Sequence, residues 1–406
     1  MTPSSPSSRA LFGHRPFLLF FLGRGFSEFA YQITAVAVGW QVYALTHSAL
    51  DLGLVGLAQF VPAVALAFVA GHVADRYDRV RIVQISQVAQ ALVAAFLAWG
   101  SFAGWLSVPQ IFAAVAILGA AGTFESPARS ALLPAVVPDG MLQRGAAVST
   151  GAWQLAMVAG PALGGLAYAV APVTPYAIMA ALWLVSGIFS GAIRVDRAPA
   201  ASDPPTLRGV FAGVDFVRHN PALLGALSLD LFAVLLGGAT ALLPIYARDI
   251  LHTGPWGLGI LRGAPAVGAL LMTIALARRA FDRHAGLRMF QAVIVFGVAT
   301  VAFALSHAIW LSLLALAVMG AADTVSVVVR VTLVQVATPD EMRGRVSAVN
   351  YLFINSSNQL GEFESGVTAA LFGAVPAAAL GGVGTILVAL LWMKFFPALR
   401  DVDRLG

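Results

Sequence analysis

The sequence contains no cysteine and very few charged residues. Among its 406 residues, Asp, Glu, Lys and Arg together make up only 11%. Without thiols, the chain has no disulfide bonds, no thiol catalysis and no cysteine metal sites. Soluble proteins carry roughly a quarter charged residues, whereas this chain is 59% hydrophobic. The composition therefore predicts a polytopic membrane protein.

Lysine and histidine are scarce as well. Lys394 is the only lysine, so the net charge of +5 comes from arginines, which lie between apolar blocks instead of forming one patch. This distribution argues against nucleic-acid binding. All seven histidines fall in predicted loops or at the ends of apolar stretches, and no HExxH motif occurs. We therefore predict that the chain is not an enzyme and holds no metal or cofactor.

The apolar stretches predict an all-α fold of twelve spans, at about 20 residues per crossing. They cover residues 17–45, 49–70, 82–104, 109–133, 144–169, 175–194, 221–248, 255–277, 287–306, 309–335, 344–373 and 377–396. The polar start lacks a small-residue cleavage site after a short apolar core, so we expect no removable signal peptide. One long polar connection divides the spans into two six-helix bundles, residues 1–194 and 221–406, joined by a linker, 195–220, with an amphipathic helix.

The positions of the basic residues predict the orientation. With the N-terminus in the cytoplasm, 19 of the 24 Lys and Arg residues fall in cytoplasmic segments. Only Arg248 falls outside, and Arg24, Arg129, Arg262 and Arg330 lie within spans. Because Lys and Arg concentrate on the cytoplasmic side of membrane proteins, we predict a multi-pass protein of a bacterial cytoplasmic membrane with both termini inside.

The two halves are related by an internal repeat. At an offset of 201, Arg129 matches Arg330, and the stretch that begins at Pro138 matches the one that begins at Pro339. The same offset relates two glycine pairs, Gly160 with Gly361 and Gly165 with Gly366. An offset of 202 relates Glu28 to Asp230. Two copies of six spans in the same orientation are typical of a transporter with its substrate site between them.

Two motifs give the resemblance to a family. The loop between the second and third spans contains Gly71, Asp75, Arg76, Arg79 and Arg81, and the fifth span reads GAWQLAMVAGPALGG. On these motifs the chain resembles the transporters of the major facilitator superfamily over its whole length. It is similar in particular to bacterial exporters of the enterobactin-exporter and macrolide-efflux branch. The resemblance implies two pseudo-symmetric six-helix bundles that work by alternating access.

The loop motif departs from the family pattern by having Asp78 where glycine is usual and Val80 where a base is common. One interpretation of the loop is a latch, in which Asp75 meets the start of another helix and the arginines hold the cytoplasmic side closed. The other is a basic loop that only sets the topology. The helix that Asp75 would meet begins near Thr338, in a sequence that has the form of a capping box.

The fifth-span motif also has two interpretations. Its glycines and proline match the signature that the family associates with antiporters and exporters, where they would limit leak. They can equally serve close helix packing, because small residues let helices approach in a bilayer. The motif residues are Gly151, Gly160, Pro161, Gly164 and Gly165.

Acidic residues within spans are costly to bury and are therefore candidates for function. Six occur: Glu28, Glu125, Asp230, Asp323, Glu362 and Glu364. Glu28 ranks first for proton coupling, since the first helix lines the cavity in the resembled family and the repeat mate, Asp230, is also acidic. Burial favours the neutral form of a carboxyl, so such a group can load and release protons.

The alternative for these acids is a structural salt bridge within one helix. Arg24, Glu28 and Gln32 share one face of the first helix, and Glu125 and Arg129 share a face of the fourth. Glu362 and Glu364 cannot share a face, because two residues are about 200° apart on a helix.

We expect the face of Glu362 to line the cavity, together with Asn355 and Asn358. Gln32 joins these two asparagines as a predicted substrate contact. Glu364 is expected to partner an arginine such as Arg262.

The sequence thus predicts a proton-coupled exporter of a siderophore, a drug or another amphipathic small molecule, acting as a monomer in the lipid bilayer. An importer or facilitator of a small metabolite is the alternative, and a membrane sensor without transport is a remote one.

Overall fold

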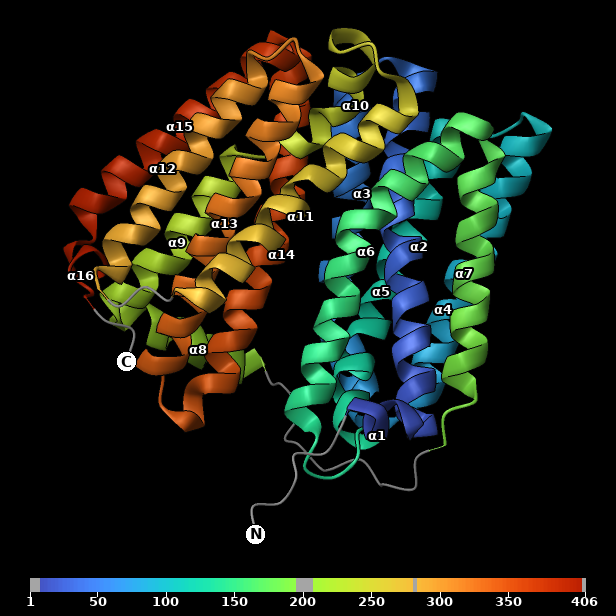
Figure 1. Ribbon diagram of the computed structural model, residues 1–406, viewed down its shortest axis with the longest axis horizontal. Helices are drawn as coiled ribbons and strands as arrows, with labels where there is room; N and C mark the ends of the chain where they lie inside the picture. The colour runs from blue at the N-terminus through green and yellow to red at the C-terminus, as the bar shows by residue number, and fades with distance from the viewer. Residues whose placement is uncertain (1–7, 195–206, 280–282, 404–406) are drawn as a thin grey trace. The chain divides into compact units, whose positions relative to one another are not determined.

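The computed structural model describes residues 8–194, 207–279 and 283–403, and every regular element in these ranges is helical (Figure 1). The first half of the chain contains α1 (Ser8–Gly13), α2 (Arg15–Thr46), α3 (Ala49–Arg76), α4 (Arg79–Ala103), α5 (Val108–Val136), α6 (Leu142–Val170) and α7 (Val173–Gly191). The second half contains α8 (Leu207–His219), α9 (Pro221–Leu236), η1 (Ala239–Leu242), α10 (Leu243–Ile245), η2 (Tyr246–Ile250), α11 (Gly254–Arg278), α12 (Ala285–Ala304), α13 (Ile309–Ala337), α14 (Asp340–Phe372), α15 (Ala374–Phe395) and α16 (Pro397–Arg400).

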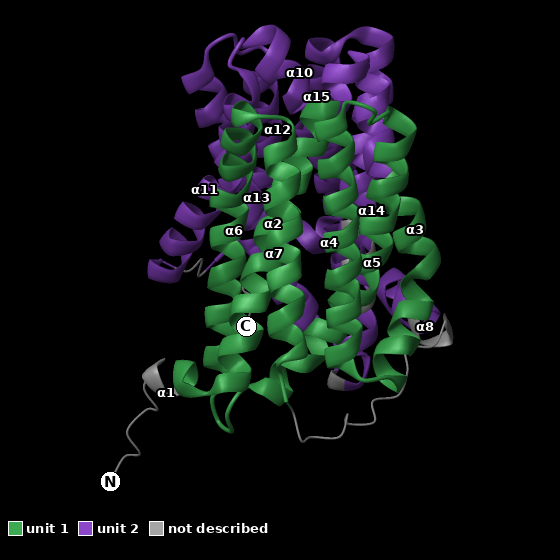
Figure 2. Ribbon diagram, turned by 90° about the vertical axis from the view of Figure 1, so that its right-hand side faces the viewer, with its two compact units in different colours: residues 1–41, 58–204 green, residues 42–57, 205–406 purple. Residues whose placement is uncertain are grey.

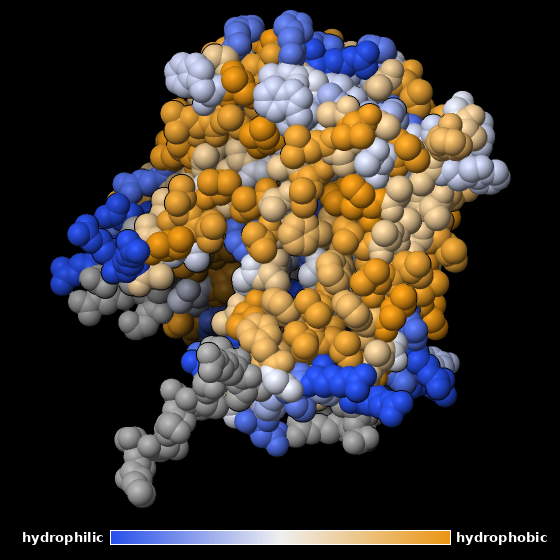
Figure 3. All heavy atoms as spheres, turned by 45° about the vertical axis from the view of Figure 1, so that its right-hand side comes forward, coloured by the Kyte–Doolittle hydropathy of each residue, from blue (hydrophilic) through white to orange (hydrophobic). Residues whose placement is uncertain are grey.

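Within the described residues, ten helical segments are long and apolar enough to cross a membrane. Helices α2 and α14, with 32 and 33 residues, are longer than any of these segments, but they contain polar side chains such as Gln32 and Glu362. The count of twelve spans stays a prediction. Large apolar side chains are exposed along the helices, for example Ile85, Leu92 and Trp99 of α4. In Figure 3, hydrophobic residues cover the sides of the helices and hydrophilic residues gather near their ends. Such surfaces suit contact with lipid, and the chain is a multi-pass membrane protein.

The chain forms two compact units (Figure 2). The first comprises residues 1–41 and 58–204, and the second comprises 42–57 and 205–406. The end of α2 and the start of α3 therefore pack with the helices of the second half. Of the predicted linker, residues 195–206 lie outside the described part of the chain, and 207–219 form α8. The predicted bundle boundaries at 194 and 221 stay a prediction.

The internal repeat extends to the packing of the helices. A Cβ atom added to Gly160 of α6 would lie 2.5 Å from Cβ of Gln32 in α2. A Cβ atom added to its repeat mate, Gly361 of α14, would lie 2.8 Å from the carbonyl oxygen of Val234 in α9. Since Val234 follows Gln32 by 202 positions, repeat mates pack against repeat mates.

A Gly160→Ala variant should be less stable than the wild type by about 1–3 kcal/mol, because the added methyl group overpacks the contact between α2 and α6. The structure supplies a matched control in the same helix. Gly151 is exposed and a Cβ atom there would meet nothing within 4 Å, so Gly151→Ala should cost no stability. Thermal unfolding of the purified proteins in detergent compares the two. Equal midpoints for Gly160→Ala and the wild type would contradict the packing role of Gly160.

Reciprocal glycine contacts join helices of the second unit. Gly268 of α11 lies directly against the backbone of Ala317 in α13, while Gly320 of α13 lies against the backbone of Pro265 in α11. Helices α12 and α15 are joined in the same way. A Cβ atom on Gly297 or on Gly382 would lie 2.8 Å from the carbonyl oxygen of the other. These helix pairs therefore touch backbone to backbone.

The seventh predicted span, residues 221–248, is not one continuous helix as expected. Helix α9 ends at Leu236, and the short elements η1, α10 and η2 follow. The break falls at Gly237 and Gly238, which have the lowest helix propensity after proline. Gly238 lies directly against the carbonyl of Gly361, a contact that a larger side chain would prevent.

Candidate functional site

Two buried carboxylates of the first unit share one arginine. Nη2 of Arg129 lies 2.9 Å from Oε1 of Glu28, and Nη1 of Arg129 lies 3.3 Å from Oε1 of Glu125. The side chains of Glu28 and Glu125 are 9% and 5% exposed. The bridge within α5 between Glu125 and Arg129 is thus confirmed. For Glu28, the interpretation as a bridge within its own helix is wrong, because its partner is Arg129 of α5 instead of Arg24.

Neutral side chains complete this cluster. Ser27 and Gln87 each donate a hydrogen bond to Oε1 of Glu125, over 3.1 and 3.0 Å, and Ser190 donates to Oε1 of Gln87 over 2.8 Å. Arg24 donates to Oγ of Ser149 over 2.8 Å. Unlike Arg24, the serines and the glutamine of this cluster were not predicted, since a serine or glutamine in a long apolar sequence does not reveal which buried charge it faces.

The second unit contains the counterpart of the pair of Glu28 and Arg129. Arg330 of α13 forms an ion pair with Asp230 of α9, and their side chains are only 3% and 7% exposed. Asp230 is the repeat mate of Glu28, and Arg330 is the repeat mate of Arg129. The signal for this pairing was present in the sequence, because an acid and an arginine recur together at nearly the same offset.

A small cavity adjoins the pair of Asp230 and Arg330. The residues that line it are Asp230, Ala233, Val234, Val293, Phe296, Ala322, Asp323 and Ser326. Asp323 lies within α13, two turns before Arg330. Within the described part of the chain, its carboxyl group forms no hydrogen bond or ion pair. Oγ of Ser326 is buried and likewise lacks a hydrogen-bond partner among the described residues.

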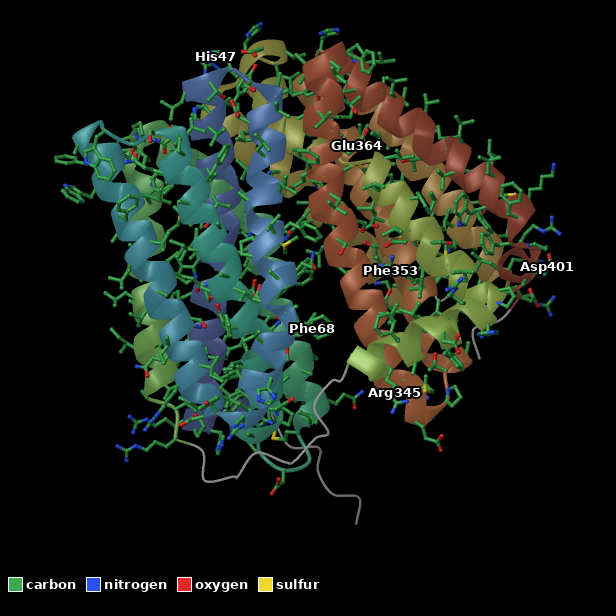
Figure 4. The ribbon with its side chains drawn as sticks, turned by 180° about the vertical axis from the view of Figure 1, so that it is seen from behind. His47, Phe68, Arg345, Phe353, Glu364 and Asp401 are labelled. Atoms are coloured by element: carbon green, nitrogen blue, oxygen red, sulfur yellow. The ribbon has the colours of Figure 1, made fainter. Side chains whose placement is uncertain are left out.

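The two acids of α14 have different partners, and Figure 4 labels one of them, Glu364. Nη2 of Arg262 in α11 lies 3.8 Å from Oε1 of Glu362. Glu364 instead accepts a hydrogen bond of 2.7 Å from Thr368 one turn away. The expectation that Arg262 partners Glu364 is wrong, since Arg262 lies on the side of α14 that carries Glu362. A Cβ atom on Gly56 of α3 would lie 3.0 Å from Oε2 of Glu362, so Gly56 leaves the space for this carboxylate.

The predicted substrate contacts differ in exposure. Gln32 is buried, and its Nε2 lies 2.7 Å from Sδ of Met157. Asn358 is exposed and donates a hydrogen bond of 2.8 Å to the carbonyl of Ile354 in the preceding turn. The side chain of Asn355 lies outside the described residues.

The basic loop is held together locally. Asp78 caps the N-terminus of α4 by accepting hydrogen bonds from the backbone N–H groups of Val80 and Arg81. This cap explains the departure from the family pattern, because aspartate is among the best N-cap residues. Nη1 of Arg79 donates to the carbonyl of Ala131 over 3.3 Å.

The acidic and glycine residues of the loop motif lie at the end of α3, and the helix that they were expected to meet begins differently from the prediction. Asp75 lies in the last turns of α3 and is half-buried, while Gly71 lies one turn earlier and Arg76 ends the helix. The capping box expected at Thr338 is wrong. Helix α14 begins at Asp340, with Pro339 at its N-cap and no side-chain cap. The hydroxyl of Thr338 is buried without a hydrogen-bond partner in the described part of the chain.

The fifth-span motif packs over part of its length. Gly160, Pro161, Gly164 and Gly165 are all buried in α6. A Cβ atom on Gly164 would lie 3.2 Å from Cα of Ile33, so this glycine and Gly160 both let α6 approach α2. The close approach expected at Gly151 is wrong, because that residue faces open space.

Comparisons with known proteins cover nearly the whole chain. The family described as transmembrane secretion effectors matches residues 6–405. The enterobactin exporter EntS of Citrobacter koseri is 27% identical over 401 residues, which are 95% of this chain and 93% of that protein. The multidrug efflux pump Tap of Mycolicibacterium fortuitum is 27% identical over 391 residues, 91% of this chain and 93% of its own.

Solved structures share the fold at low sequence identity. A bacterial homolog of the human lysosomal transporter Spinster, in an inward-facing and unoccupied conformation, superposes with a TM-score of 0.74 at 12% identity, over 95% of this chain and 98% of that one. A bacterial homologue of the iron transporter ferroportin, in an inward-facing state, gives 0.70 at 17% identity, over 95% and 99% of the two chains. The predicted all-α membrane fold is confirmed.

Proposed function

This chain belongs to the major facilitator superfamily, within its transmembrane secretion effectors, and from that membership we propose that it is a proton-driven exporter of an amphipathic small molecule. It is a transporter and not an enzyme, as its sequence predicted. The relatives that export enterobactin or drugs support the direction and the substrate class, a siderophore or a drug. The proposed location is a bacterial cytoplasmic membrane, with both termini in the cytoplasm and a monomer as the working unit.

The observation that carries the proton coupling is the ion pair between Glu28 and Arg129, buried in the first unit. Removing one partner of such a pair leaves an uncompensated charge in an apolar setting. Protonation of Glu28 breaks the pair, because it removes the negative charge on α2 that Arg129 faces, but it strands no charge on Glu28 itself. Arg129 retains Glu125 as its other partner. A proton can therefore release α2 from α5 at this point without leaving the arginine unpaired.

Coupled transport requires that proton and substrate favour different conformations. In the proposed cycle, a proton on Glu28 favours one facing state and substrate favours the other, so that each must leave before the other binds. The loop with Asp75, Arg76, Arg79 and Arg81 would hold the cytoplasmic side closed in the outward-facing state. The glycines of α6 would keep its contact with α2 tight enough to limit leak.

In a Glu28→Gln variant, pH-gradient-driven transport should fall about tenfold or more. A coupling free energy of about 1–3 kcal/mol produces a change of this size. Glutamine keeps the shape of the side chain but cannot carry the proton. The measurement is movement of ethidium in proteoliposomes with an imposed pH gradient. Glu341→Gln is the matched control, since Glu341 is an exposed glutamate at the start of α14. Full activity of Glu28→Gln would reject Glu28 as the coupling residue.

The alternative function is an importer or facilitator of a small metabolite, and the direction of transport separates it from the proposed exporter. An exporter lowers the ethidium content of cells, and an uncoupler should restore it. Accumulation of ethidium that an uncoupler does not change would favour a facilitator.

A further inference from the structure

The buried clusters of the two units differ in their balance of acids and bases. In the first unit, Glu28 and Glu125 pair with Arg129, and Arg24 is close enough to interact electrostatically with both carboxylates. Two acids thus face two bases. In the second unit, the positions that match Arg24 and Glu125 are Ala226 and Ser326. The repeat has lost one base and one acid there.

The second cluster nevertheless contains a second acid. Asp323 lies one helical turn before Ser326 on α13 and lines the same cavity as Asp230. The repeat mate of Asp323 is Gly122, so this carboxyl group has no counterpart in the first unit. Within the described part of this cluster, two acids, Asp230 and Asp323, accompany a single base, Arg330, which is paired with Asp230.

Among the described residues, the surroundings of Asp323 supply no other cation. From α9 the cavity receives Asp230 and the apolar residues Ala233 and Val234, and from α12 it receives Val293 and Phe296. On α13, the polar neighbour is Ser326, which is uncharged. The other intramembrane arginine of this unit, Arg262 of α11, pairs with Glu362 of α14.

Asp323 is half-buried, and most of the side chains that line its cavity are apolar. Its ionised form would add a second negative charge beside Asp230 there, and an unpaired charge in such a setting is far more costly than a neutral carboxyl group. A proton on Asp323 removes this cost. We propose that Asp323 is a second proton-binding site, separate from Glu28, and that it holds its proton while Arg330 is paired with Asp230. The proposal extends the proposed function, because it gives each unit a protonatable acid beside a paired arginine.

Infrared spectroscopy tests the proposal without a substrate. A protonated carboxylic acid has a carbonyl stretching band that a carboxylate lacks, and the spectrum can be recorded on the full chain in lipid vesicles at neutral pH. The wild type should show this band. Asp323→Asn should abolish it, and Asp323→Glu should shift it, which assigns the band even if the asparagine variant does not fold. Ser326→Ala removes the polar neighbour but no acid and should retain the band.

The outcomes separate this inference from proton-driven export. A band that persists unchanged in Asp323→Asn and Asp323→Glu, or that disappears in Glu28→Gln instead, would overturn the proposal, as would a wild type without the band. If ethidium transport proves independent of a pH gradient while the Asp323 band is present, proton-driven export fails and the proton-binding site stands. If transport is proton-driven and the Asp323 band is absent, proton-driven export stands and the proton-binding site at Asp323 fails.

Discussion

Replacement of Arg330 with methionine is expected to lower the free energy of unfolding by about 3–5 kcal/mol, the usual cost of removing one partner from a buried ion pair. Arg330 is 3% exposed and pairs with Asp230, which is 7% exposed. Methionine fills a similar volume, so the loss reports the stranded carboxylate and not a cavity. Unfolding in mixed micelles, followed as the fraction of denaturing detergent rises, measures the difference from the wild type.

Two further variants give the Arg330 prediction its controls. The double variant Asp230→Asn with Arg330→Met removes both charges and should recover most of the lost stability, because a neutral pair strands no charge. Arg262→Met is the matched control, since its pair with Glu362 is longer, at 3.8 Å, and its side chain is 23% exposed. It should lose less than Arg330→Met. Equal losses for the two variants would show that burial does not set the cost.

Replacement of Arg129 with methionine should have the second large effect, because this single side chain is shared by two acids. Its removal leaves both Glu28 and Glu125 without their ion pair, and a cost of about 3–5 kcal/mol is expected from the stranded charges. Arg24 stays near both carboxylates and compensates in part. The variant should also lose proton-driven transport, since Glu28 then has no arginine to release.

The Arg129 prediction is checked by neutralising the acids one at a time. Stability should rise in steps when Glu28→Gln and then Glu125→Gln are added to Arg129→Met. The control is Arg144→Met, which changes an exposed arginine at the start of α6. If Arg129→Met has the same unfolding free energy as the wild type, the prediction is wrong, and Arg24 alone compensates the charges of Glu28 and Glu125.

The architecture could be predicted from composition, charge and repeat, because each of these is a property of many residues at once. Helix length follows from bilayer thickness, and the low charge density leaves few other folds. The buried acids could also be identified one by one, since a charge in an apolar span has a known cost. The match of Gly160 to Gly361 predicted a shared role, and both glycines do pack against repeat mates in α2 and α9.

Partner choice could not be predicted in the same way. An arginine side chain reaches several neighbouring helices, so the sequence could not tell that Arg129 would also pair with Glu28 of α2, or that Arg262 would meet Glu362 in place of Glu364. Gly151 fitted a motif but faces open space, because a motif does not define which turn of a helix lies at a contact. The break in the seventh span could have been anticipated from Gly237 and Gly238, a glycine pair that the apolar pattern masked.

The reciprocal glycines of the second unit determine which helices can move relative to one another. Gly268 and Gly320 fix α11 to α13, and Gly297 and Gly382 fix α12 to α15, each through main-chain atoms at distances that leave no room for another atom. If the two helices of such a pair slid past one another, they would have to break these main-chain contacts. If they rotate together as one body, the contacts are kept. Any motion that carries substrate should therefore leave these two helix pairs intact as rigid rods, and crosslinks placed across either pair should leave transport unimpaired.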